Sequence, residues 1–286
     1  MARCEVCFHR CEIPEGGRGL CGARTCADGR VIPENYGRVT ALALDPIEKK
    51  PLRRFHPGGM VLSVGSYGCN LRCPFCQNHE ISWSAEAMSY AERADKVTPE
   101  ALVRTAVRLK GEGNIGIAFT YNEPLIGWEF VRDTARLAHE AGLASVLVTN
   151  GTARLAVLEA IAPWIDAMNI DLKGFTNRYY SKVLGGSLDM VRAFIEAAVR
   201  TCHVELTTLI VPGENDTADE MRALSTWVAG LTDAAGRPIG REIPLHISRF
   251  FPRFKMTDRR ATDVSRVYRL ADVARERLEY VYTGNC

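Results

Sequence analysis

The pattern of apolar and polar positions changes near residue 60. Beyond it, short apolar runs alternate with longer segments in which apolar residues recur every three or four positions. The runs predict buried strands, and the longer segments predict amphipathic helices. The predicted strands cover residues 60–64, 115–120, 144–149, 167–172, 203–210 and 244–248.

The predicted helices lie between these strands. Thr98, Pro99 and Glu100 have the order of an N-cap residue, a proline at the first helical position and an acid in the first turn. Leu102 and Ala106 then begin an apolar stripe. Comparable stripes begin at Val131, Leu155, Val191, Met221 and Val264.

Six strand–helix units in a row predict a parallel sheet with helices on the outside. Such a sheet is either a closed or partly closed TIM-type barrel or a flat, doubly wound sheet. Polar residues follow or close nearly every predicted strand, and they converge on one mouth only if the sheet curls. We therefore predict an α/β fold with a partial (βα)6 TIM-type barrel. These polar residues are Cys69, Asn122, Glu123, Asn150, Asp171, Lys173, Thr207, Thr208, His246 and Arg249.

The composition restricts the class of protein. The chain has 286 residues, of which 47% are hydrophobic, and a formal net charge of +2. This ordinary hydrophobic content excludes a disordered chain, and no apolar run approaches the roughly 20 residues of a membrane-spanning helix. No block of like charge indicates a nucleic-acid partner. Charged residues, Arg3 and Glu5, already occur within the first five positions, and no apolar core of a signal peptide follows them. We therefore expect a cytoplasmic protein.

The ten cysteines are more typical of metal or redox chemistry than of disulfides in a cytoplasmic chain. Eight of them lie before residue 77. Residues 1–58 are also rich in Gly, Pro and charge, with a short strand-like run at 39–44. We therefore expect a small Cys-rich N-terminal extension over 1–58, followed by the barrel over 59–286. Cys202 and Cys286 stand alone and are expected to be buried thiols.

Three cysteines follow the first predicted barrel strand with the spacing C-x3-C-x2-C. Cys69, Cys73 and Cys76 can hold three irons of a [4Fe–4S] cluster. No fourth cysteine lies nearby, so one iron would be open to a small molecule. Two alternatives remain: Cys202 could supply a fourth thiolate for an electron-transfer cluster, or His79 could complete a zinc site, although structural zinc prefers paired C-x2-C ligands.

This motif, with the aromatic Phe75 before its last cysteine, resembles that of the radical S-adenosylmethionine (SAM) superfamily. The resemblance implies a partial barrel in which the open iron binds the amino and carboxylate groups of SAM. It also implies that an electron from the cluster cleaves SAM to methionine and a 5′-deoxyadenosyl radical, which abstracts hydrogen from a substrate. Phe75 and Gln77 are expected to contact the cofactor by the same resemblance.

Later strand ends resemble further motifs of the superfamily. Asn122 and Glu123 lie where relatives bind the methionine amino group, although a carboxylate there can also cap the helix that starts near Pro124. Four polar residues at the later strand ends lie in segments that resemble motifs of glycyl-radical activating enzymes, and the resemblance implies that they contact the cofactor. Asp171 and Lys173 could equally form a salt bridge, and His246 could be a hydrogen-bonded rim residue. The positions concerned are Asn150, Asp171, Lys173 and His246.

Over almost its whole length the chain resembles the pyruvate formate-lyase activating enzyme-like subgroup, in the form called AmmeMemoRadiSam proteins. The segments that carry this likeness are residues 4–7, 13–16, 45–52 and 282–285. The resemblance implies a radical SAM oxidoreductase that installs a glycyl radical on a partner enzyme. Hydrogen abstraction from a small molecule or peptide is the alternative within the class. A non-catalytic iron–sulfur electron carrier or a metal-stabilised scaffold is the alternative outside it. Flavodoxin or ferredoxin is the implied reductant, because the chain carries no flavin motif.

The N-terminal cysteines form a second candidate metal site. Cys4, Cys7, Cys11 and Cys21 have the spacing C-x2-C-x3-C-x9-C, which suits zinc or a second iron–sulfur cluster. So short a segment has little core of its own, so a metal would supply much of its folding energy. The alternative is a set of free thiols packed against the barrel, and Cys26 could substitute for one of the four.

Overall fold

The protein is built around one eight-stranded sheet in the computed structural model, which describes residues 1–87, 94 and 96–286. The strand order is β12-β11-β10-β9-β8-β7-β6-β5, and every neighbouring pair is parallel except β5 and β6. The strands are β5 (Ala41–Pro46), β6 (Met60–Gly65), β7 (Asn114–Phe119), β8 (Ala144–Thr149), β9 (Ala167–Asp171), β10 (His203–Ile210), β11 (Leu245–Arg249) and β12 (Val281–Gly284).

The six predicted barrel strands are confirmed to within one residue at each end. The sheet has two further strands at its edges. β5 comes from the predicted N-terminal extension and pairs with β6 over six residues, while β12 extends the sheet beyond β11. Within the described residues β5 and β12 are not paired, so the sheet is an open, partial barrel, as predicted. The division of the chain at residue 58 remains a prediction.

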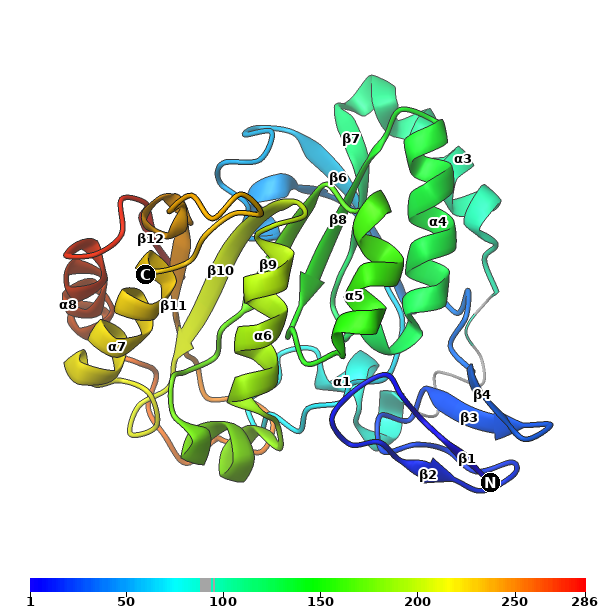
Figure 1. Cartoon of the computed structure of the whole chain (residues 1–286), viewed down its shortest axis with the longest axis horizontal. Helices are drawn as coiled ribbons and strands as arrows, with labels where there is room; N and C mark the ends of the chain where they lie inside the picture. Colours follow the sequence, from blue (N-terminus) through cyan, green and yellow to red (C-terminus); the bar gives the residue numbers. More distant parts are fainter. Residues whose placement is uncertain (88–93, 95) are drawn as a thin grey trace.

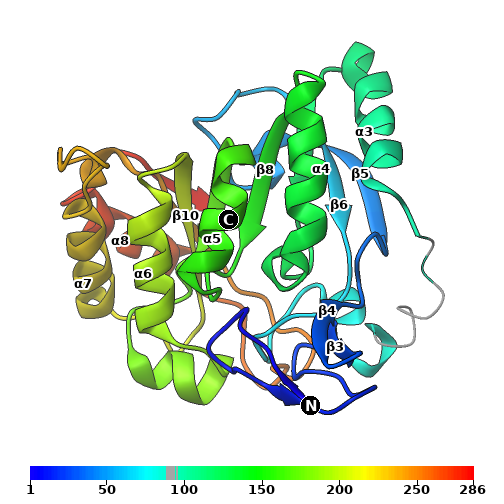
Figure 2. The ribbon, with the colours of Figure 1, turned by 45° about the vertical axis from the view of Figure 1, so that its right-hand side comes forward.

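Helices cover the outer face of the sheet, and α4, α5 and α6 lie side by side along it (Figures 1 and 2). The predicted start of α3 is confirmed, because the Thr98 hydroxyl accepts a hydrogen bond from the Ala101 N–H at 3.2 Å. No helix in this described part of the chain is long and apolar enough to cross a membrane. The helices are α1 (His79–Ser82), α3 (Pro99–Arg108), α4 (Trp128–Glu140), α5 (Leu155–Ile161), α6 (Leu188–Ala198), α7 (Ala218–Ala229) and α8 (Val264–Arg275).

Alternate strand residues divide between two cores, as the pleat of a strand requires. The outward-facing set packs under the helices in one large cluster. The inward-facing set is smaller and packs around Ile47 and Leu52, both 0% exposed, from the segment between β5 and β6. This segment therefore fills part of the barrel interior. The inward-facing residues in contact with it are Val61, Ala118, Val146 and Ala167.

The N-terminal segment forms two short hairpins, β1 (Ala2–Arg3) with β2 (Glu12–Ile13) and β3 (Arg24–Ala27) with β4 (Arg30–Pro33). They lie beside α1, at the end of the molecule to which the carboxyl ends of the strands point (Figure 1). A buried ion pair between Arg24 and Glu129, with N···O at 2.7 Å, joins this segment to α4.

Cys202 and Cys286, the two cysteines that stand alone in the sequence, are less buried than predicted. Cys286 is exposed rather than buried, and Cys202 is half-buried. Cys286 follows β12, which lies at one edge of the sheet in the described part of the chain.

Candidate active site

A cavity of about 630 Å³ opens at the carboxyl ends of the strands. Its wall includes all three cysteines of the C-x3-C-x2-C motif, from the loop 66–78 that follows β6, here called the cluster loop. It also includes all eight residues expected to contact the cofactor, so the structure brings the predicted site together. These eight are Phe75, Gln77, Asn122, Glu123, Asn150, Asp171, Lys173 and His246.

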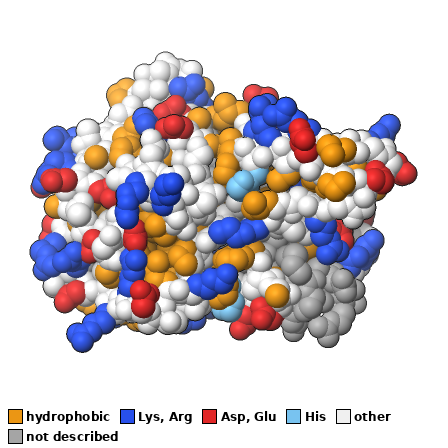
Figure 3. All heavy atoms as spheres, turned by 90° about the horizontal axis from the view of Figure 1, so that it is seen from below, with side chains coloured by type: hydrophobic (Ala, Val, Ile, Leu, Met, Phe, Trp, Pro, Cys, Tyr) orange, Lys and Arg blue, Asp and Glu red, His pale blue; other side chains and the backbone are white. Residues whose placement is uncertain are grey.

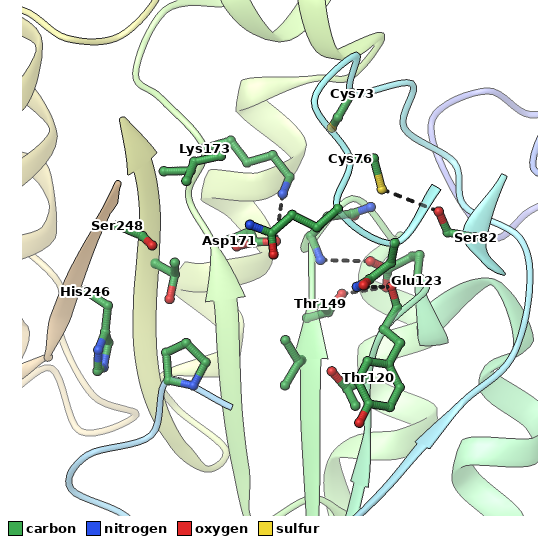
Figure 4. A pocket seen from close by; sticks show the side chains of 18 of the residues that line it. Cys73, Cys76, Ser82, Thr120, Glu123, Thr149, Asp171, Lys173, His246 and Ser248 are labelled. Atoms are coloured by element: carbon green, nitrogen blue, oxygen red, sulfur yellow. Dashed lines mark hydrogen bonds and ion pairs between the residues drawn. The ribbon is translucent and has the colours of Figure 1, made fainter. Parts of the chain in front are cut away.

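The three cysteines of the cluster loop approach one another at one end of the cavity, where Figure 4 shows Cys73 and Cys76. Polar groups point at two of the sulfurs. The Leu71 N–H donates to the Cys69 sulfur at 3.4 Å, and the Ser82 hydroxyl lies 3.5 Å from the Cys76 sulfur. Hydrogen bonds to ligating sulfurs are one of the means by which proteins tune iron–sulfur clusters.

Burial raises the pKa of the Cys69 thiol well above its ordinary value and that of Cys73 to about 11. Without a bound cation these groups are therefore neutral thiols, whereas ligation to a metal removes the proton. Within residues 1–87, 94 and 96–286, no three His, Cys, Asp or Glu side chains are arranged to hold one metal ion. A cubane cluster does not need that arrangement, because each thiolate binds a different iron. The donor set therefore fits a cluster.

Asn122 anchors the start of the cluster loop. Its side-chain carbonyl accepts from the Ser66 N–H at 3.0 Å, and its NH₂ group donates to the carbonyls of Tyr67 and Gly68 at 3.1 and 3.2 Å. The amide is thus largely engaged by the backbone. A cofactor contact of Asn122 remains a prediction, while its positioning of the loop is a feature that the sequence motif alone did not reveal.

Glu123 is buried and takes the capping role considered from the sequence. One carboxylate oxygen accepts from the Leu125 N–H at 3.1 Å and from the Thr149 hydroxyl at 2.6 Å, and the other from the Asn150 N–H at 2.8 Å. Burial raises the pKa of Glu123 to about 7, although these hydrogen bonds oppose the shift. A carboxylate has about four acceptor positions, so one remains for a ligand in the cavity.

Asn150 ties the third strand end to the cluster loop. Its NH₂ group donates to the Asn70 side-chain carbonyl at 3.0 Å and points at the Cys69 sulfur at 3.8 Å. Its carbonyl accepts from the Thr152 N–H at 2.9 Å. Asn150 is therefore placed to orient a cysteine of the motif.

Asp171 and Lys173 form the salt bridge considered from the sequence, with N···O at 2.7 Å (Figure 4). Burial lowers the pKa of Lys173, but the Asp171 carboxylate and the nearby Cys73 outweigh it and raise that pKa above its ordinary value. Lys173 is therefore a fixed cation close to the cysteines.

His246 lies across the cavity from the labelled cysteines (Figure 4). Its Nε2 is 2.6 Å from a carboxylate oxygen of Glu205, whose side chain is 0% exposed. Glu205 also accepts from the backbone N–H groups of Arg53 and Arg54 at 3.0 and 2.7 Å, and pairs with His203 at 3.0 Å. His246 is thus a hydrogen-bonded rim residue, and its contact with a cofactor remains a prediction.

Glu205 was not singled out from the sequence, although a signal was present. His203, Glu205 and Thr207 alternate along β10, so their side chains share the inward face. Three polar residues on the inward face of a buried strand require partners, and one of these partners, His246, lies on the far wall of the cavity. Glu48, Lys49 and Arg53, from the segment that fills the barrel, also line the cavity.

Comparisons with known proteins agree with this geometry. The sequence matches the radical SAM superfamily over residues 63–225. Uncharacterized protein MJ0808 of Methanocaldococcus jannaschii is 40% identical over 286 residues, which is 99% of this chain and 81% of that protein. The chain therefore belongs to the radical SAM superfamily and is an enzyme of that type, which uses a [4Fe–4S] cluster and SAM.

Pyruvate formate-lyase 1-activating enzyme of Escherichia coli is 26% identical over 166 residues, 56% of this chain and 65% of that enzyme, so the alignment spans less than two thirds of its length. The solved structure of Escherichia coli QueE has a TM-score of 0.53 at 13% identity, over 86% of this chain and 92% of QueE. Streptococcus suis SuiB has a TM-score of 0.58 at 13% identity, over 78% of this chain and 48% of SuiB. These structures show the fold alone. Over part of its length, the chain is thus similar in sequence to a pyruvate formate-lyase activating enzyme.

Proposed function

We propose that this enzyme cleaves SAM reductively at a [4Fe–4S] cluster and directs the resulting 5′-deoxyadenosyl radical at a substrate hydrogen. The observation that carries the proposal is the meeting of Cys69, Cys73 and Cys76 with the polar strand ends in one cavity. When bound, the reduced cluster supplies the electron that breaks the sulfonium bond of SAM. The chain's own residues hold, orient and shield the reactants.

Cys69, Cys73 and Cys76 would hold three irons of the cluster, and the fourth iron would bind the methionine part of SAM. Glu123 has one acceptor position left, which suits the ammonium group of SAM. A cation there favours the ionised carboxylate, so binding would also lower the raised pKa of Glu123. The fixed cation Lys173 suits a carboxylate or another anionic group of the ligand.

Apolar packing would help to keep water from the radical. Phe75 is 6% exposed and packs edge-on against Phe250, with the ring centroids 6.1 Å apart. Phe250 comes from the segment that follows β11, so this contact closes the cluster loop against the far side of the barrel. Exclusion of water protects a reactive intermediate from side reactions.

For the substrate, we propose a glycine residue of a partner enzyme, which would become a glycyl radical. The likeness to pyruvate formate-lyase 1-activating enzyme supports this choice. A polar small molecule is the second candidate, because Glu48, Lys49 and Arg53 place both signs of charge in the lining of the cavity. Figure 3 shows Lys and Arg side chains interspersed with Asp and Glu on the face that it draws. For the reductant, we propose flavodoxin or ferredoxin, as the resemblance of the sequence implies.

The anaerobically reconstituted enzyme, treated with dithionite and SAM, tests the reaction. We expect 5′-deoxyadenosine from the wild type and none from Cys73→Ala, which also loses the visible absorbance of the cluster. Cys202→Ala, which lies outside the cavity, is the matched control and should keep both. Cleavage of SAM by Cys73→Ala would refute the proposal. So would the absence of cleavage in a wild-type enzyme that contains the cluster.

Deuterium transfer separates the two substrate candidates. A glycyl-radical enzyme that carries α-deuterated glycine should pass deuterium into 5′-deoxyadenosine and acquire an organic radical signal in electron paramagnetic resonance (EPR). Transfer from a deuterated small molecule, with none from the glycine, would favour the second candidate and reject the first.

A further inference from the structure

Four cysteines of the N-terminal segment, Cys4, Cys7, Cys11 and Cys21, lie together and are here called the N-terminal cysteine group. The Cys4 N–H donates to the Cys11 carbonyl at 2.8 Å, which sets these two residues side by side. The Cys7 thiol lies close enough to Cys4 and Cys21 to interact electrostatically. The Cys21 thiol interacts in the same way with Cys4 and Cys11. Every member is therefore next to at least one other.

The N-terminal cysteine group is shielded from solvent. Three of its members are 6% to 8% exposed, and the fourth, Cys11, is half-buried. The Leu20 N–H donates to the Cys11 sulfur at 3.5 Å. Cys26, which the spacing left as a substitute, instead donates to the Glu15 carboxylate at 3.3 Å. The group is thus limited to the four.

The arrangement of these thiols favours a cluster over a single ion. Zinc needs four ligands on one ion, with sulfur at about 2.3 Å, and the described residues hold no group of three such side chains arranged around one ion. A [4Fe–4S] cluster spreads its four thiolates over four irons. The cysteines of the cluster loop, in an enzyme whose family uses a [4Fe–4S] cluster, have the same property.

The N-terminal cysteine group is joined directly to the cluster loop. The Cys69 N–H donates to the Cys21 carbonyl at 3.2 Å, so one hydrogen bond links a member of each cysteine set. The Arg72 guanidinium donates to the Leu20 carbonyl. Figures 1 and 2 both show the N-terminal hairpins at the end of the molecule where the cluster loop lies. A short path for an electron therefore runs between the two sets.

We propose that the N-terminal cysteine group holds a second [4Fe–4S] cluster, which passes electrons to the cluster of the cluster loop. The inference rests on the proposed function, because that function places a cluster on Cys69, Cys73 and Cys76. A reduced flavodoxin or ferredoxin would lose one electron to the second cluster, which would go from the 2+ to the 1+ state. The second cluster would return to 2+ when it passes this electron to the SAM-binding cluster, which would go from 2+ to 1+. No proton moves and no bond breaks in either transfer.

Metal analysis and EPR of the anaerobically reconstituted full chain test the site. The wild type should contain about eight irons and no zinc, and Cys11→Ala about four irons. Cys26→Ala, from the same segment, is the matched control and should keep about eight. Four irons with one zinc in the wild type, or four irons and no other metal, would overturn the proposal.

A second variant keeps the test valid if Cys11→Ala fails to fold. The triple replacement of Cys69, Cys73 and Cys76 by alanine should retain about four irons and an EPR signal that SAM does not change. A triple variant without iron would overturn the second cluster. If instead SAM changes no signal of the wild type, the proposed function fails, while the iron of the triple variant still reports on this site.

Reduction kinetics test the relay. With reduced flavodoxin, we expect Cys11→Ala to form 5′-deoxyadenosine about tenfold or more slowly than the wild type, because the entry cluster is lost. With dithionite, a small reductant that can enter the cavity, both should react at similar rates. Equal rates with flavodoxin would refute the relay, and Cys26→Ala should match the wild type with both reductants.

Discussion

Replacing Glu205 by glutamine should weaken the far wall of the cavity. Each carboxylate oxygen accepts from one backbone N–H, of Arg53 or Arg54, and each faces one histidine ring nitrogen. An amide has one carbonyl and one NH₂ group. In either orientation the NH₂ group therefore meets a backbone N–H, and one buried donor loses its acceptor.

The size of the effect follows from the pKa of Glu205. Burial raises this pKa, but hydrogen bonds from His203, His246 and the two backbone groups outweigh it and lower it from 4.5 to about 2. A depressed pKa in the folded state means stabilisation that is present above the unfolded value and lost as the pH falls through the folded value. The difference corresponds to about 3 kcal/mol at neutral pH.

Urea denaturation of the reconstituted enzyme under anaerobic conditions measures this effect. At pH 8 Glu205→Gln should lower the free energy of unfolding by about 3 kcal/mol. In acid unfolding the difference should shrink from about pH 4.5 towards pH 2, where the wild-type carboxylate gains its proton.

Asp219→Asn is the control, because the Asp219 side chain is 96% exposed and its ion pair is with the surface residue Arg222. It should leave the urea midpoint unchanged. Equal stability of Glu205→Gln and the wild type would refute the reasoning.

Two further changes test how the cluster loop is held. Gly68 has φ +92°, and a Cβ there would lie 2.6 Å from the Ala23 Cβ; Gly58 has φ +81° and open space around it. Gly58→Ala should therefore cost only the backbone strain of about 1–2 kcal/mol. Gly68→Ala should lower the free energy of unfolding by about 1–3 kcal/mol more than Gly58→Ala does, and it should also lower the iron content. Equal urea midpoints for the two variants would contradict the close packing at Gly68. Asn122→Ala removes three hydrogen bonds to residues 66–68 and should cost about 3 kcal/mol. Ser66→Ala deletes a buried hydroxyl that has no partner within the described residues, so it should lower the free energy of unfolding far less than Asn122→Ala. Similar losses of iron in the two variants would contradict the anchoring role of Asn122.

Much of the barrel could be predicted from the sequence because its strands are buried on both faces. Such strands are continuous apolar runs, and their ends are marked by polar residues. The sequence pattern indicates the two edge strands, β5 and β12, less clearly. The run at 39–44 was visible as strand-like, but its place beside β6 depends on a pairing that no local pattern encodes. β12 is only four residues long.

The candidate site could be located from the sequence, but the roles of its side chains could not be separated. Asn122 and Glu123 belong to a recognisable motif, yet their hydrogen bonds run to Ser66 and Asn150, far away along the chain. Whether a polar side chain is still available to a ligand depends on such tertiary contacts. His246 could be identified as a candidate because it lies at the end of a predicted strand. Its partner Glu205 lies 41 residues earlier in the chain and was not identified.

The proposed function requires that the cluster on Cys69, Cys73 and Cys76 has one iron open to SAM. Electron–nuclear double resonance of the reduced enzyme with SAM labelled with ¹⁵N in its amino group and ¹⁷O in its carboxylate tests this claim most directly. We expect hyperfine coupling of both labels to the cluster, and no such signals with unlabelled SAM. Absence of coupling in an enzyme that contains the cluster and binds SAM would contradict it.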